Sequence, residues 1–501
     1  MLDMALISIP RLSIEVPPLN IAQLKACLVR NGFSAKCFDM NIELYKFLNF
    51  DEWLEVDSYF QTDLRYTGND VSSEKQRDIQ FSDMHLKKVK QLNCTERYLM
   101  FIEEYISYII EEYNPRVVGI SVFSVNSVLP CLDVCSILRS RFPDVTILLG
   151  GQGVSSFGVG GRPNFGGYMV ETGLADYFIS GEGENAIIDF MKEKKSLYNI
   201  PQIDNLDSLP YPVYDDFNFE DYPGDTNLVY TTGSRGCVRN CSFCDIRSLW
   251  KKYRYRSADH ILGEMLEIYK MHGTTEFYFT DSLINGNLKM FKELCRKILE
   301  RKQTGELPEN LMWGGQWITR VAGQMQDEDY RIASESGLYN LSIGIESGST
   351  QVLESIGKGV RREDIDVEME FLYRYGIRCN MLMIVGYPTE TLEDFEQTLD
   401  MFRCYKKYSD AGIIWGVNLG KTLVILPGAL LGENPGHYGV DFEEDGNWIN
   451  PETGLDYQER VRRRMVLQNV CEDLGFVIKS TVTTINSLHT IVLEGGYDSI
   501  S

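Results

Sequence analysis

The chain has 501 residues, 49 basic and 72 acidic side chains, and a formal net charge of −23. This length exceeds the usual single domain, so two or three domains are expected. The acidic excess argues against a nucleic-acid backbone as partner, because phosphate binding needs concentrated Lys and Arg.

Twelve cysteines without a framework spacing argue against a disulfide scaffold and favour a reducing compartment, which predicts the cytoplasm. The first residues lack the basic segment of a signal peptide. No apolar run approaches the ~18 residues of a membrane span, so none is expected. The densest basic run, residues 460–464, predicts a solvated helix face.

Residues 1–200 alternate short β-rich runs with helical patterns, which predicts a parallel α/β sheet. The expected strands are 5–9, 35–40, 117–122, 145–149 and 177–180, and the expected helices are 18–31, 97–113 and 127–141, with another after Glu184. Residues 41–95 interrupt this alternation and predict a mostly helical insertion. Ligands of such sheets bind at the carboxyl ends of the strands.

Residues 201–226 are rich in Pro, Asp and Tyr, which is typical of a linker or strap between domains. A second α/β series follows at 227–430. Its expected strands are 227–232, 276–280, 311–318, 341–346, 380–385 and 413–417, and its helices are 258–271, 288–301, 328–336, 362–375 and 392–405. Six β/α units in this order predict a partial barrel. Residues 431–501 predict a small C-terminal appendage.

Three cysteines, Cys237, Cys241 and Cys244, fall within eight residues directly after the first strand of this second series. Soft thiolates select zinc, copper(I) or iron–sulfur centres. Structural zinc normally takes a fourth Cys or His, and the nearest histidine, His260, lies on an expected helix beyond the loop. A disulfide would use two thiols and leave the third. Three ligands instead leave one iron of a cubane able to bind another molecule.

This C-x3-C-x2-C spacing, with Gly236 before the first cysteine and Phe243 before the last, resembles the radical S-adenosylmethionine (SAM) superfamily. The resemblance implies an oxygen-sensitive [4Fe–4S] cluster on the three cysteines. Its fourth iron binds S-adenosyl-L-methionine, whose one-electron cleavage gives methionine and a 5′-deoxyadenosyl radical. The cofactors supply this chemistry, and the protein supplies placement, electrostatics and exclusion of water. An electron donor such as flavodoxin or ferredoxin is also implied.

Later motifs resemble the cobalamin-linked branch of that superfamily and extend the likeness over residues 227–430. They are Arg-x-Arg-Ser at 254–257, the strand end at 277–282, Gly-Ile-Glu-Ser-Gly at 344–348 followed by Lys-Gly at 358–359, Val-Gly-Tyr-Pro-Thr-Glu at 385–390 and Pro-Gly at 427–428. At 281–282 the branch usually has two acidic residues, and only Asp281 is present here. The order of the motifs is more specific than any one of them.

The resemblance implies SAM contacts at four positions. Phe243 lines the adenine site, and its alternative is core packing. Asp281 contacts the cofactor or caps the next helix. Glu346 contacts the polar end of the cofactor or forms a structural salt bridge. The backbone at Gly386 flanks the adenine.

The same branch places a cobalamin-binding domain, doubly wound and flavodoxin-like, before the barrel, and residues 1–200 resemble it outside the insertion. Candidate cobalamin contacts lie at the carboxyl edge of the sheet: Ser8, Ser121, Phe123, Gly150, Gly151, Gln152, Gly181 and Glu182. The Asp-x-His-x-x-Gly motif that supplies a histidine to cobalt is absent, as in many members of this branch. An empty domain remains an alternative. Cys131 and Cys135, one helical turn apart, are read as buried free thiols rather than a metal pair.

The working hypothesis is methyl transfer to an unactivated carbon or phosphorus centre of a small-molecule or peptide substrate. The main alternative is a non-methylating cyclisation, ring contraction or rearrangement, and another is a cluster-bearing sensor without turnover. A methylthiotransferase is disfavoured, because residues 1–200 lack the second set of cluster cysteines. The catalytic residues cannot be assigned. On or after the third barrel strand, Trp313, Gln316, Trp317 and Arg320 are candidates to line a pocket, and core packing explains the two tryptophans equally well.

Overall fold

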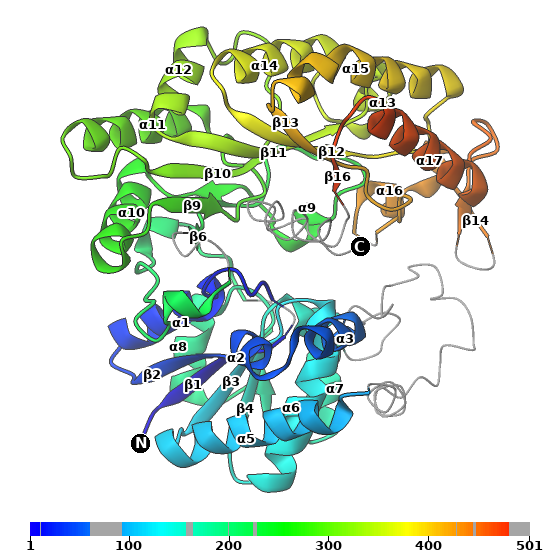
Figure 1. Ribbon diagram of the computed structural model, residues 1–501. Helices are drawn as coiled ribbons and strands as arrows, with labels where there is room; N and C mark the ends of the chain where they lie inside the picture. Colours follow the sequence, from blue (N-terminus) through cyan, green and yellow to red (C-terminus); the bar gives the residue numbers. More distant parts are fainter. Residues whose placement is uncertain are drawn as a thin grey trace. The chain divides into compact units, whose positions relative to one another are not determined.

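The computed structural model (Figure 1) describes the chain in eight stretches. They are residues 1–10, 12–60, 93–156, 164–198, 200–223, 228–426, 428–443 and 447–479. Most of the expected insertion (61–92), Pro427 of the expected Pro-Gly and the end of the expected appendage lie outside the described residues.

The first unit contains a five-stranded, all-parallel sheet in the order β2-β1-β3-β4-β5. Its strands are β1 (Met4–Ser8), β2 (Ala35–Asp39), β3 (Val117–Ser121), β4 (Thr146–Gly150) and β5 (Tyr177–Phe178). This is the flavodoxin-like order, whose topological switch point lies between the first and third strands. The predicted doubly wound sheet is confirmed.

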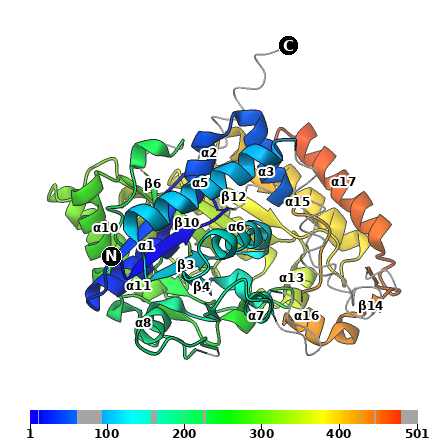
Figure 2. The same cartoon turned by 90° about the horizontal axis from the view of Figure 1, so that it is seen from below.

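Helices cover both faces of this sheet, because alternate strand residues point to opposite sides. On one side, Met4 and Leu6 pack under α1 (Leu19–Arg30) and α8 (Gly183–Glu193). On the other, Ala5 and Ile7 pack under α2 (Met40–Phe47), α3 (Phe50–Phe60), α5 (Thr95–Tyr113) and α6 (Val128–Arg141). Figure 2 shows α5 beside α2 and α3. The interruption expected at 41–95 therefore begins with a core helix, α2.

One helix of this unit was not predicted. α7 (Phe165–Glu171) has two glycines in its first turn, and glycine disfavours helix. The Asn164 side chain accepts a hydrogen bond from the Gly167 amide, which caps the helix. Burial of Phe165 and Met169 in the core also favours the helix.

Residues 200–223 form a strap bound to the first unit. Buried Lys25 pairs with Asp215 and, at 2.5 Å, with Asp216. The Tyr222 hydroxyl donates to Asp39 at 3.0 Å, and burial raises the pKa of Asp39 to about 7 despite this bond. These contacts favour the strap over the linker, the two alternatives predicted for this segment.

The second unit contains an all-parallel, seven-stranded sheet in the order β6-β9-β10-β11-β12-β13-β16. Its strands are β6 (Leu228–Thr231), β9 (Glu276–Phe279), β10 (Met312–Trp317), β11 (Leu338–Glu346), β12 (Arg378–Met383), β13 (Ile414–Asn418) and β16 (Ile478–Lys479). Helices α10 (Ala258–His272), α11 (Leu288–Gln303), α12 (Asp327–Glu335), α14 (Arg362–Arg374), α15 (Leu392–Asp410) and α17 (Tyr457–Asp473) connect the strands and lie along one side of the sheet (Figure 1). The predicted open barrel is confirmed.

The described part of the small C-terminal appendage predicted at 431–501 packs onto this second unit. β16 pairs with β13 and adds a strand to the six expected. α17 packs against α15. Short elements, α16 (Leu430–Glu433), β14 (Asp441–Phe442) and β15 (Trp448–Ile449), precede them, and α13 (Thr350–Ile356) follows β11. None of these was predicted.

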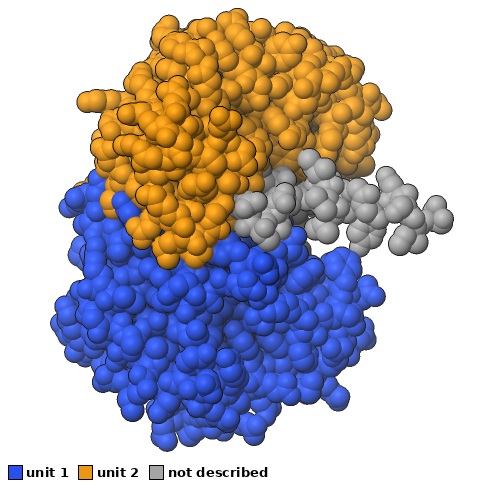
Figure 3. Space-filling model, turned by 60° about the vertical axis from the view of Figure 1, so that its left-hand side comes forward, with its two compact units in different colours: residues 1–226 blue, residues 227–501 orange. Residues whose placement is uncertain are grey.

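The two compact units are residues 1–226 and 227–501, coloured separately in Figure 3. The strap thus belongs to the first unit and the three-cysteine loop to the second. Within the described residues, no helix combines the length and apolar character needed to cross a membrane.

Candidate metal centre and ligand-binding edges

The three cysteines lie on the loop that leaves the carboxyl end of β6. A short antiparallel pair, β7 (Ser234–Arg235) with β8 (Arg254–Tyr255), closes this loop at its base. Within it, the Cys244 amide donates to the Cys241 carbonyl at 3.1 Å, and the Arg239 amide donates to Cys237 Sγ at 3.3 Å. The loop therefore has internal structure of its own.

These thiols differ from the other cysteines of the described residues. All three are free and partly exposed, whereas the other described cysteines are buried except for exposed Cys404. Burial raises the pKa of Cys241 to about 11; the Lys358 ammonium opposes this, and the Cys237 and Cys244 thiols add to it. A bound metal centre would instead favour the thiolate form, because it deprotonates a coordinating thiol.

Three accessible thiols on one loop at a sheet's carboxyl edge fit the donor set expected for an iron–sulfur cluster. Among the residues that the structure describes, no three His, Cys, Asp or Glu side chains are grouped as ligands of a single metal ion.

The segment after α13 packs against the cysteine loop. The Ser242 amide donates to the Ile356 carbonyl at 2.8 Å. A Cβ on Gly359, which has φ +70°, would lie 2.4 Å from Arg239 Nη1. Lys358, between these two contacts, is 6% exposed. The Lys358 side chain is thus buried beside the cysteine loop.

Lys358 forms an ion pair with Glu346, at 2.7 Å between Nζ and Oε1. Glu346 ends β11 with φ +66°, and the pairing of β11 with β12 shifts register between Gly344 and Glu346. A non-glycine residue in this region is strained, and such residues concentrate at functional sites. The structural salt bridge predicted as the alternative for Glu346 is therefore present, while its contact with SAM stays a prediction.

Asp281, which follows β9, is 2% exposed and accepts a hydrogen bond from the Gly233 amide at 2.7 Å. Burial raises its pKa to about 7, although hydrogen bonds from Ser234 and Gly233 act in the opposite direction. The helix-cap alternative is wrong, because α11 is capped by Asn287. Asp281 instead anchors the start of the cysteine loop, and its contact with SAM stays a prediction.

Gly386 lies in the turn after β12 with φ +74°, and its amide donates to Glu390 Oε2 at 3.1 Å. Phe243 packs against an apolar cluster that includes Ile356 and Tyr387, so the core-packing alternative describes its contacts. The hydrogen bond that joins these two regions was not predicted from the sequence. The Tyr387 hydroxyl lies 2.6 Å from the Ser242 hydroxyl, inside the cysteine loop.

In the first unit, the structure brings three of the candidate residues into one row. Ser8 is in register with Ser121, and Ser121 with Gly150, at the carboxyl ends of β1, β3 and β4. Ser121 also accepts a hydrogen bond from the Asn20 side chain at 2.8 Å. This row begins at the switch point of the sheet, where folds of this kind bind ligands.

Most of the remaining candidates of this unit are exposed to solvent, and one is buried and hydrogen-bonded. Phe123, Gly151 and Gln152 are exposed, and a Cβ on Gly151 would lie 2.4 Å from the Val122 carbonyl oxygen, so the turn requires glycine. Gly181 is exposed with φ +126°. Glu182 is buried, and its carboxylate accepts from the Ile203 amide, which ties the strap to the sheet.

Two other groups have structural environments. Cys131 and Cys135 are buried with their sulfurs 3.9 Å apart, as expected for free thiols in a core. Trp313 and Trp317 are buried, and Trp317 donates to Glu368 at 3.1 Å, so both tryptophans pack in the core. Gln316 is exposed.

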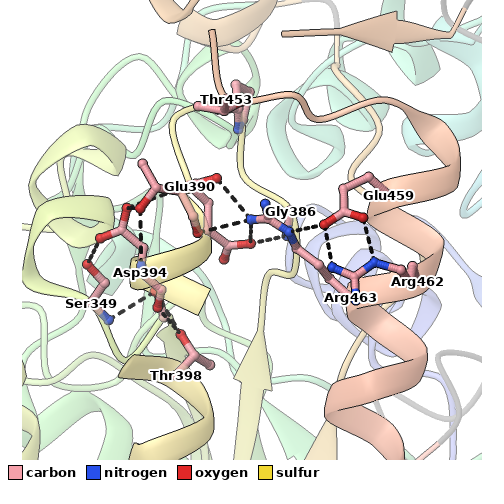
Figure 4. Close-up of polar contacts among 12 residues, drawn as sticks. Ser349, Gly386, Glu390, Asp394, Thr398, Thr453, Glu459, Arg462 and Arg463 are labelled. Carbon is pink, nitrogen blue, oxygen red and sulfur yellow. Dashed lines mark hydrogen bonds and ion pairs between the residues drawn. The ribbon is translucent and has the colours of Figure 1, made fainter. Parts of the chain in front are cut away.

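The basic run at 460–464 is not the solvated face that the sequence predicts. Arg460 and Arg463 are 2% and 1% exposed. The Arg462 side chain is 55% exposed and pairs with Glu459. Arg463 is held by Glu390 and Glu459 (Figure 4).

Residues 231–402 match the family model described as the radical SAM superfamily. An uncharacterized methyltransferase of Pyrococcus horikoshii is 26% identical over 318 residues, which cover 59% of this chain and 65% of that protein. The anaerobic magnesium-protoporphyrin IX monomethyl ester cyclase of Rubrivivax gelatinosus is 24% identical over 329 residues, which cover 60% and 56%. The chain thus spans less than two thirds of both relatives.

A solved structure shares the fold over most of its length. The radical SAM methyltransferase TsrM from Kitasatospora setae, with cobalamin and a [4Fe–4S] cluster bound, superposes with a TM-score of 0.61 at 16% identity. The superposition covers 93% of this chain and 91% of that one. The match to the radical SAM superfamily model thus covers the stretch that contains the cysteine loop and strands β9 to β12 of the second sheet.

Proposed function

We propose that this protein is a cobalamin-dependent radical SAM methyltransferase acting on an unactivated carbon or phosphorus centre. The observation that carries the proposal is the partly exposed loop of Cys237, Cys241 and Cys244 at the carboxyl edge of an open parallel barrel. TsrM, a methyltransferase that holds cobalamin and the cluster, has the same fold. When bound, the cluster supplies an electron for cleaving SAM, and cobalamin carries the methyl group.

The residues of the chain have separate tasks in this proposal. The three cysteines hold the cluster, and Asp281 fixes the first residues of their loop through Gly233. Phe243, Asp281, Glu346 and Gly386 surround the position proposed for SAM. At the other sheet, the row of Ser8, Ser121 and Gly150 forms the edge proposed for cobalamin, together with Phe123, Gly151, Gln152 and Gly181. Glu182 supports that edge through the strap.

The proposed partners follow from this chemistry. The substrate is a small molecule or a peptide, and flavodoxin or ferredoxin provides the electron. Because the cluster is oxygen-sensitive and the cysteines are free, we place the protein in the cytoplasm.

Anaerobic reconstitution with iron, sulfide and cobalamin tests the proposal. The absorption spectrum should contain iron–sulfur and cobalamin bands, and SAM with a reductant should give both 5′-deoxyadenosine and S-adenosylhomocysteine. The Cys241→Ser variant should lose the iron–sulfur bands, and Cys404→Ser, at an exposed position outside the loop, should keep them. Binding of zinc alone by the wild-type thiols would refute the proposal.

A second reaction is kept because of one specific relative, the cyclase of Rubrivivax gelatinosus. A non-methylating cyclisation uses the radical without consuming the methyl group of SAM. Formation of 5′-deoxyadenosine without S-adenosylhomocysteine in cobalamin-loaded protein would favour it over methyl transfer.

A further inference from the structure

Arg463 of α17 is a buried cation with several partners. Its Nη1 donates to the Glu390 carboxylate at 3.0 Å, to the Glu390 carbonyl at 2.9 Å and to the Thr391 carbonyl at 3.1 Å. Its Nε donates to Glu459 at 2.9 Å. Figure 4 shows the side chain reaching from α17 to the turn that follows β12. Arg463 therefore fixes the end of that turn through side-chain and backbone acceptors together.

Glu390 connects Arg463 to Gly386, at the start of the turn. The carboxylate oxygen that accepts from Arg463 also accepts from the Gly386 amide at 3.1 Å. The Glu390 amide donates to the Tyr387 carbonyl at 2.8 Å. Both Glu390 and Arg463 are 1% exposed, so water does not compete for these bonds.

Arg460, one helical turn before Arg463, packs on the same turn. A Cβ on Gly386 would lie 2.7 Å from Arg460 Cγ, so the aliphatic stem covers the glycine directly. The guanidinium stacks over Trp448, 3.7 Å from the ring centre, and donates to the Trp448 carbonyl at 2.6 Å. The stem is thereby fixed at both ends.

The turn held in this way reaches the cysteine loop through Tyr387. Its hydroxyl lies 2.6 Å from that of Ser242 and donates to the Ser355 carbonyl at 3.3 Å. Tyr387 and Ser242 are buried, at 0% and 2% exposure. Ser242 stands between Cys241 and Cys244, so a shift of Tyr387 shifts the backbone that carries both thiols.

We propose that Arg460 and Arg463 are positioning residues for the cluster, which clamp the 386–390 turn and thereby fix Ser242 through the Tyr387 hydroxyl. This inference rests on the proposed function, because it requires a cluster on the three cysteines. It assigns α17 a task at the cluster, although the helix contributes no cluster ligand.

The test uses cluster-loaded protein and measures the rate at which iron passes to an added chelator. Tyr387→Phe removes one hydroxyl, and loss of a hydrogen bond of this kind corresponds to about fivefold faster iron release. Arg463→Gln should accelerate release at least as much, and Arg463→Lys should restore part of the wild-type rate because it keeps the charge.

Matched controls separate positioning from general loosening. Arg462→Gln alters the exposed neighbour, and Tyr438→Phe alters a tyrosine whose ring packs edge-on against Tyr387; both should release iron at the wild-type rate. The electron paramagnetic resonance spectrum of the reduced cluster should change less on SAM addition in Tyr387→Phe than in wild type. A melting temperature close to that of wild type would show that this variant is folded.

The outcomes also separate this inference from the proposed function. A wild-type chain that takes up no iron–sulfur cluster refutes the proposed function and the clamp together. A wild-type chain that holds the cluster and cleaves SAM, beside a folded Tyr387→Phe variant with the same iron release and spectrum, refutes the clamp alone.

Discussion

Replacing Lys358 by Met tests how strongly the buried pair beside the cysteine loop depends on both charges. The Lys358 and Glu346 side chains are 7% and 9% exposed, with 2.7 Å between Nζ and Oε1. Removing the ammonium leaves the Glu346 carboxylate buried without its cation. Breaking such a pair on one side costs about 3–5 kcal/mol of unfolding free energy.

The double variant Glu346→Gln with Lys358→Met gives the sharper result, because it removes both charges. A buried pair exchanged for neutral groups of similar size is often neutral in stability, so the double variant should cost less than either single one. Lys406→Met is the control: its pair with Asp410 is exposed along α15 and contributes about 0.5 kcal/mol or less.

Urea unfolding of cluster-free protein, followed by tryptophan fluorescence, measures these differences. Of the six tryptophans only Trp53 lies in the first unit, so the signal reports mainly on the second. A cost of under about 1 kcal/mol for Lys358→Met would contradict the dependence of the pair on both charges, and so would a double variant that costs as much as the two single variants added together.

Three further outcomes are expected. Burial raises the pKa of Glu368 to about 7, above its value in the unfolded chain. The protonated carboxyl therefore contributes to stability at low pH, and this contribution is lost as the pH rises toward 7. In urea titrations, wild type should lose about 2 kcal/mol of unfolding free energy relative to Glu368→Gln between pH 5 and pH 8. Gly386→Ala should lower the melting temperature, because the methyl group meets the Arg460 stem and the φ is left-handed; an unchanged melting temperature would contradict this. Asp281→Asn should cost about 1–3 kcal/mol in urea unfolding, because the amide offers one oxygen to the two donors Gly233 and Ser234; a neutral result would deny the anchoring role.

Much of the fold was predictable because it is encoded locally. Strands such as Val117–Ser121 and Ile414–Asn418 are apolar runs between turn residues, and buried parallel strands read in this way. β16 was missed because it contributes two residues, too few for a pattern, and exists through its pairing with β13. α7 was not predicted because its two glycines have low helix propensity. The burial of Phe165 and Met169 that favours the helix depends on tertiary packing, which the local sequence does not reveal.

The site was predictable where one short segment carries the chemistry, and less so where distant segments meet. The three cysteines are visible as a spacing. Asp281 was visible as an acidic residue after a strand, but its partner Gly233 lies 48 residues earlier, so a helix cap was the local alternative. The contact of Ser242 with Tyr387 spans 145 residues and has no local signal in either segment.

The basic run of α17 shows most clearly why local patterns fail. Four arginines in five residues suggest a solvated face, because an unpaired buried charge is very costly. That cost is offset when residues distant in the sequence provide partners. Arg463 forms an ion pair with Glu390 of the turn after β12, and Arg460 stacks on the ring of Trp448 and donates to its carbonyl. Glu390 also belongs to the motif that indicated a SAM-facing turn, so the sequence contained both charges without their pairing. A buried arginine run should therefore be considered wherever a chain also carries an acidic residue in a predicted core turn.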